Sequence, residues 1–119
     1  MMIDTSTLPV VDVHCHPFVR QGEVTSEEFT NTVSFGGGST AYMTAGGVSV
    51  DDEVVGELQR IKRDVVYFRH MLLQLADFFD CPPELEQVIA ERNKAVATDY
   101  ADYVKRLFDD CGLTTLVTD

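Results

Sequence analysis

The sequence is poor in positive charge, with 9 lysines and arginines against 20 aspartates and glutamates among its 119 residues. The formal net charge of −11 at pH 7 disfavours nucleic acid and anionic membrane surfaces as partners. Long apolar runs are missing, so no transmembrane helix is expected, and the amino terminus lacks the basic and apolar regions of a secretory signal. We therefore expect a cytoplasmic protein.

Cysteine is also sparse. The three cysteines Cys15, Cys81 and Cys111 form an odd number and no Cys-x-x-Cys pair. A small secreted protein stapled by disulfides is therefore excluded, and a reducing compartment is favoured. The hydrophobic content of 45% suffices for one core, so the chain is expected to form a single, partial domain over residues 1–119.

One stretch carries recognisable chemistry. Residues 9–15 form an apolar segment typical of a β-strand, and it ends in the pair His14-x-His16 before Pro17. Because side chains alternate along a strand, Asp12, His14 and His16 are expected on one face. Two imidazoles so spaced can converge on one metal ion, and we predict a divalent metal, zinc in the first instance. Two ordinary strand-end histidines are the alternative.

The middle of the chain is predicted to be helical. Residues 18–48 are read as a loop with one short helix, which begins at the capping box formed by Thr25 and Glu28. Residues 51–111 are read as a long helical hairpin that begins at Asp51 and turns at Pro82 and Pro83. The first of its helices is predicted to be continuous over about seven turns, because apolar residues recur at steps of four and three. These residues are Val54, Leu58, Ile61, Val65, Phe68, Leu72, Leu75 and Phe79.

The hairpin is expected to end at Gly112, and a second strand rich in β-branched residues follows over residues 113–118. A strand that follows a helix normally joins a parallel sheet, so Asp119 would lie at the same sheet edge as His14 and His16. The order strand, helices, strand predicts an α/β fold, namely one βα portion of a larger protein with an inserted helical hairpin. The chain is thus expected to be a segment.

At His14-x-His16, preceded by Val11, Asp12 and Val13, the sequence resembles the metal-dependent hydrolases of the amidohydrolase superfamily. The stretch from Gly112 to Asp119 is similar to the Amidohydro-2 branch, which includes the amidohydrolase-like regions of FluG-type proteins. This resemblance implies the first βα portion of a (β/α)8 (TIM) barrel. It identifies His14 and His16 as metal ligands, whereas the family's remaining ligands and its base have no counterpart here.

The activity implied by the resemblance is metal-assisted hydrolysis of a small molecule with an amide or carboxylate group, or decarboxylation at the same site. Asp12 and Asp119 are expected to orient ligands or to face the substrate, and a structural role for Asp12 is equally consistent. The segment alone is expected to be inactive. Homo-oligomers are also expected, because isolated strands leave exposed edges.

A second hypothesis is a free-standing helical hairpin that binds another protein through its apolar seam, with an incidental His-x-His pair. Two other residues are interpreted as structural. His70 lies within the first long helix and is read as a surface or packing residue, and Arg92 as an ion-paired structural arginine.

Overall fold

The computed structural model describes residues 4, 7–15, 20–34 and 39–118, which form six helices and two strands. The chain divides into two compact units, one of Glu23–Asn93 and one that combines Met1–Gly22 with Lys94–Asp119. Within the described residues, no helix is both long enough and apolar enough to cross a membrane.

The unit Glu23–Asn93 begins with helix α1 (Ser26–Val33). The predicted capping box is present: the Glu28 backbone N–H donates to the Thr25 hydroxyl at 3.2 Å, and the Thr25 backbone N–H donates to the Glu28 carboxylate at 2.8 Å. The hydrogen bond from the Thr25 backbone lowers the pKa of Glu28. Because the pKa of Glu28 is lower in the folded than in the unfolded state, its ionised carboxylate stabilises the folded state at neutral pH. This stabilisation is lost as the pH falls through the folded-state pKa.

The long helix predicted after Asp51 is broken in two. Helix α2 (Ser39–Ala45) precedes α3 (Asp52–Asp64), whose N-cap is Asp51, as predicted; its carboxylate accepts the Val54 N–H at 3.0 Å. Val65 then adopts an extended conformation, with φ −72° and ψ 144°, before α4 (Val66–Phe79) begins. The prediction of one continuous helix is therefore wrong. The apolar repeat runs across Val65, but the backbone hydrogen-bond ladder does not.

The core of this unit is a cluster formed by three buried side chains from three helices: Phe29 of α1, Phe68 of α4 and Ile89 of α5 (Leu85–Thr98). Partly buried side chains pack around it, namely Val24, Val33, Met71, Leu75 and Leu85. The chain turns between α4 and α5 at Asp80, which takes the left-handed conformation with φ 52°. Pro82 and Pro83 follow after Cys81. The predicted turn is thus present, and the helices on its two sides pack through this cluster.

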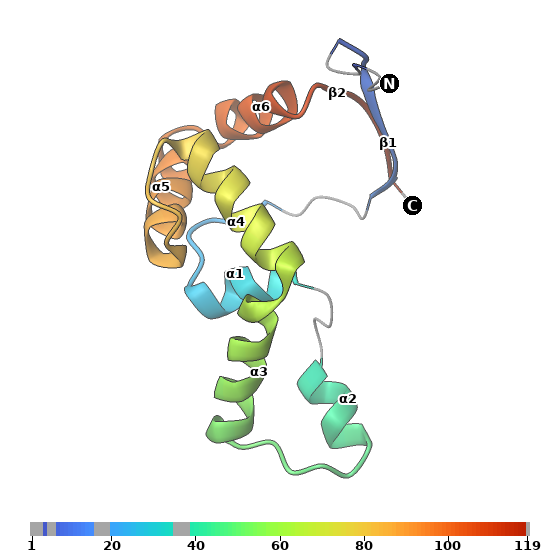
Figure 1. Cartoon of the computed structure of the whole chain (residues 1–119), viewed down its shortest axis with the longest axis vertical. Helices are drawn as coiled ribbons and strands as arrows, with labels where there is room; N and C mark the ends of the chain where they lie inside the picture. The colour runs from blue at the N-terminus through green and yellow to red at the C-terminus, as the bar shows by residue number, and fades with distance from the viewer. Residues whose placement is uncertain (1–3, 5–6, 16–19, 35–38, 119) are drawn as a thin grey trace. The chain divides into compact units, whose positions relative to one another are not determined.

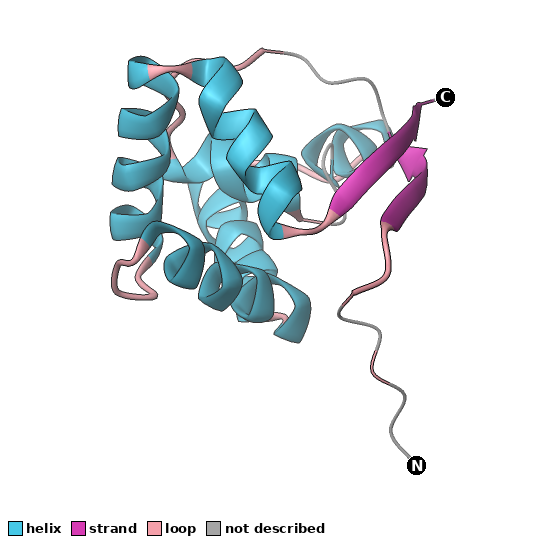
Figure 2. Ribbon diagram, turned by 90° about the horizontal axis from the view of Figure 1, so that it is seen from above, coloured by secondary structure: helices cyan, strands magenta, loops and turns pink. Residues whose placement is uncertain are grey.

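The other unit contains the two strands. Strand β1 (Val10–Cys15) pairs in parallel with β2 (Leu113–Thr118), the residues predicted as strand, and α6 (Tyr100–Asp110) leads into β2 and contacts it (Figures 1 and 2). Asp99 caps α6 by accepting the N–H groups of Ala101 and Asp102. Gly112 ends the helix with φ 63°, a conformation that costs other residues free energy.

The predicted α/β class, with the chain as the first βα portion of a (β/α)8 barrel carrying an inserted hairpin, is wrong. The described chain is mainly helical, and its only sheet has two strands. Two parallel strands cannot close a barrel, which requires about eight strands with a consistent tilt and stagger. The error arose because a strand, helix, strand order is compatible with many larger sheets, and the order alone does not show that one forms.

We predict that Phe68→Ala will lower the free energy of unfolding by about 3 to 5 kcal/mol, because Phe68 is 2% exposed and joins three helices. Chemical denaturation followed by circular dichroism measures this loss. The matched control is Ile61→Ala on α3, which should have a smaller effect because Ile61 is 48% exposed. Equal losses for the two variants would contradict the assignment of the core.

Candidate functional site

The candidate site lies at the carboxyl end of the two paired strands. The amino ends are joined by a hydrogen bond from the Val10 N–H to the Gly112 carbonyl at 3.0 Å, and Val10 lies opposite Leu113. At the other end, Cys15 lies opposite Thr118. Because the strands are parallel, both carboxyl ends lie at one edge of the sheet, and the chain continues from there into His16 and Asp119.

The register between the strands contains two irregularities. From Val10 to Val11 strand β1 advances one residue, while β2 advances two residues, from Leu113 to Thr115. Thr114 is therefore an extra residue in β2. Its hydroxyl donates to the Val10 carbonyl at 3.1 Å, which satisfies that acceptor beside the bulge.

The second irregularity has the opposite sense. Between Asp12 and Cys15 the first strand advances three residues, while β2 advances two, from Leu116 to Thr118. The two bulges cancel, so the strand ends stay in register. His14 lies within the second bulge, and bulges interrupt the strict alternation of side chains. The expected common face of Asp12, His14 and His16 therefore stays a prediction.

The sheet exposes apolar side chains to solvent. Val13 is 75% exposed, and Val11 of β1 and Val117 of β2 are about half exposed. Parallel sheets in globular proteins are normally covered on both faces. The two strands therefore present uncovered apolar surface and unpaired edges within the described part of the molecule.

The predicted site residues differ in how far they can be located. Asp12 is half-buried and lies opposite Leu116 in the register. The backbone of His14 belongs to β1, but its side chain is outside the described structure, and His16 and Asp119 lie wholly outside the described residues.

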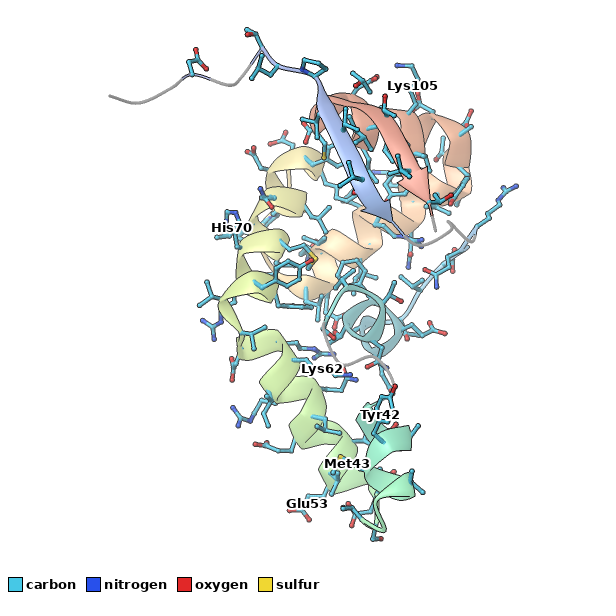
Figure 3. The ribbon with its side chains drawn as sticks, turned by 90° about the vertical axis from the view of Figure 1, so that its right-hand side faces the viewer. Tyr42, Met43, Glu53, Lys62, His70 and Lys105 are labelled. Carbon is cyan, nitrogen blue, oxygen red and sulfur yellow. The ribbon has the colours of Figure 1, made fainter. Side chains whose placement is uncertain are left out.

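No group of three or more histidine, cysteine, aspartate or glutamate side chains that could hold a metal occurs among the described residues. His70 is exposed on α4 and projects away from the helix (Figure 3), in agreement with its interpretation as a surface residue. The described residues therefore contribute no complete metal site of their own.

Cys81 is a poor candidate for a metal ligand or nucleophile. Burial raises the pKa of its thiol, and the negative charges of Glu91 and Asp80 raise it further. A metal ligand or nucleophile must be the thiolate, which this surrounding disfavours. Cys81 follows the α4 C-cap, where its N–H donates to the Ala76 carbonyl, so its position is explained by the turn.

Arg92 is buried, in agreement with a structural role, whereas its predicted ion pair stays a prediction. It is 8% exposed, and its guanidinium donates to the Asn93 side-chain oxygen at 3.0 Å. Asn93 in turn binds both backbone groups of Val24: it accepts the N–H at 3.1 Å and donates to the carbonyl at 2.9 Å. Asn93 thereby attaches the segment before α1 to α5. Sequence patterns gave no signal for this role, because Asn93 and Val24 are 69 positions apart.

Comparisons with known proteins identify no relative: no family model matches the chain, and no curated protein or solved structure is significantly similar to it. The resemblance to amidohydrolases thus rests on the His14-x-His16 strand and the Gly112–Asp119 stretch alone.

We predict that iodoacetamide will alkylate Cys81 more slowly than Cys111 at pH 8, because the raised pKa of Cys81 reduces its thiolate fraction and because Cys111 is exposed. Peptide mass spectrometry over time measures both rates in one sample. In denaturant the two rates should converge. Faster alkylation of Cys81 in the native protein would contradict this view and restore it as a candidate ligand.

Proposed function

We propose that the chain carries the metal-ligand pair of an amidohydrolase-like, metal-dependent hydrolase, with His14 and His16 as ligands of a divalent ion. The observation that supports this proposal is the parallel pairing of β1 and β2 with their carboxyl ends in register. The strand that precedes His16 and the strand that precedes Asp119 end at the same edge, which is where parallel sheets commonly present functional groups. The expected substrate is a small molecule with an amide or carboxylate group in the cytoplasm.

The chemistry of the donors suits zinc, since imidazole nitrogen is one of its preferred ligands. A bound divalent ion lowers the pKa of its water ligand to about 7 and polarises a carbonyl group. Asp12 and Asp119 are the carboxylates proposed to orient the imidazoles or to face the substrate. The two histidines themselves hold the ion and must be neutral to do so.

Two histidines provide only part of a zinc site. Catalytic sites usually contain three protein ligands, and the described residues contain no cluster of three. We therefore propose that the 119-residue chain alone binds zinc weakly and does not catalyse hydrolysis.

We predict that the double change of His14 and His16 to Ala will abolish zinc binding by this chain. Calorimetric titration with zinc chloride should give one weak, saturable site for the native protein and none for the double variant. Binding should weaken as the pH falls through about 6.5, the ordinary pKa of imidazole, because protonated rings cannot bind the ion.

His70→Ala is the matched control, since it removes an exposed histidine from α4 and should leave the titration unchanged. Zinc binding that survives in the double variant would refute the proposal. A tight site accompanied by turnover of amide substrates would instead refute the statement that this chain is an incomplete site.

A second candidate function is self-association through the outer face of α4. Val66 is 83% exposed and Leu73, seven residues later on the same face, is 56% exposed. Arg69 and Asp77 lie four residues before and after Leu73. In an antiparallel pair of α4 helices centred on Leu73, each Arg69 would exchange its partner Asp64 in the same chain for Asp77 of the second copy, so that the surface is complementary to itself.

We predict that Leu73→Glu will lower the mass of the particle measured by sedimentation equilibrium, because it places two carboxylates at the centre of this pairing. Gln74→Glu is the matched control: it introduces the same charge at the neighbouring exposed position, away from the centre, and should change the mass less. If the native protein is monomeric, or if both variants behave alike, α4 is not the interface.

A further inference from the structure

A cleft of about 630 Å³ lies along α6, within the unit that combines Met1–Gly22 with Lys94–Asp119. Its wall includes Tyr100, Val104 and Phe108, which recur every four residues and form one stripe on the helix, and Leu113 at the start of β2. All four side chains are partly exposed. The volume lies within the range of about 300 to 1,000 Å³ that is typical of sites for small molecules.

Arg20 provides a positive charge at this apolar cleft. Its guanidinium carbon lies 5.2 Å from the centre of the Tyr100 ring, a cation–π distance. Among the described residues Arg20 has no carboxylate partner. The stacking covers one face of the guanidinium, and the N–H groups at its edge point in the plane, where they can bind a planar anion.

The second cation of the cleft already has an anionic partner. Lys105, on α6 (Figure 3), forms an ion pair with Asp109 one turn later, and the hydrogen bond that it donates to Asp109 raises the pKa of Lys105. The cleft thus combines an apolar stripe, one neutralised ion pair and one guanidinium without an anionic partner in the described structure.

We propose that this cleft binds a hydrophobic monocarboxylate, with the carboxylate on Arg20 and the hydrocarbon part against Tyr100, Val104 and Phe108. A guanidinium and a carboxylate form two parallel hydrogen bonds, and apolar surface on both partners is removed from water. A single charge on the ligand matches the single available cation. A multiply charged anion such as a phosphate ester is disfavoured because the cleft offers one available cation and the chain has a net charge of −11. The site requires no metal, so it is independent of the function proposed for His14 and His16.

The experiment is a calorimetric titration of the full chain with 4-phenylbutyrate in the presence of EDTA. Two further ligands separate the contributions: 4-phenylbutyramide has the same shape without the charge, and butyrate has the charge without the ring. We expect 4-phenylbutyrate to bind and both comparison ligands to bind at least about tenfold more weakly, the loss that follows from removing a hydrogen-bonded charge or an aromatic ring.

Two variants locate the site. Arg20→Gln, a change at an exposed residue, should weaken 4-phenylbutyrate about tenfold or more and leave the weak binding of the amide unchanged. Arg106→Gln is the control. It removes an exposed arginine of α6 and should leave both affinities unchanged. Absence of 4-phenylbutyrate binding, equal affinity for acid and amide, or equal effects of the two variants would each overturn the proposal.

Discussion

The parallel pairing of β1 and β2 is the constraint on which the proposed site depends. It joins residues about 100 positions apart in a direction that no tight turn can produce, so the helices between the strands form the crossover connection. Closing so long a loop costs about 4 kcal/mol in chain entropy. The helices reduce this cost, because the cluster of Phe29, Phe68 and Ile89 already orders much of the intervening chain.

The same pairing explains why this molecule has uncovered apolar surface. A parallel sheet with exposed Val11, Val13 and Val117 would be more stable if it were covered. The two bulges, one at Thr114 and one between Asp12 and Cys15, cancel and keep the strand ends aligned. Bulges are frequent beside functional sites, which is consistent with a functional role for the carboxyl edge.

The excess of negative charge makes each unpaired cation informative. Arg60 binds Asp64 within α3, Arg69 of α4 binds the same carboxylate across the break between the two helices, and Lys105 binds Asp109, so these positive charges are neutralised locally. Ion pairs this exposed contribute little to stability. Arg20 differs because it lies against an aromatic ring beside an apolar cleft. Arg20 is therefore the cation of this cleft that is suited to bind an anionic ligand.

The sequence by itself determined the features that depend on neighbouring residues: the capping box at Thr25, the cap at Asp51, the helix end at Gly112 and the strand over 113–118. These arise from hydrogen bonds and backbone preferences within a few positions, so a local pattern suffices to predict them. The tertiary structure alone decided the break at Val65, the bulged register and the absence of a barrel among the described residues. Position 65 is a valine, which is neither a glycine, a proline nor a residue whose side chain can cap a helix. The apolar repeat also continues through it, so the sequence contains no local signal for the break. Strand register and the number of strands depend on contacts between distant segments, whose free energies no local pattern contains.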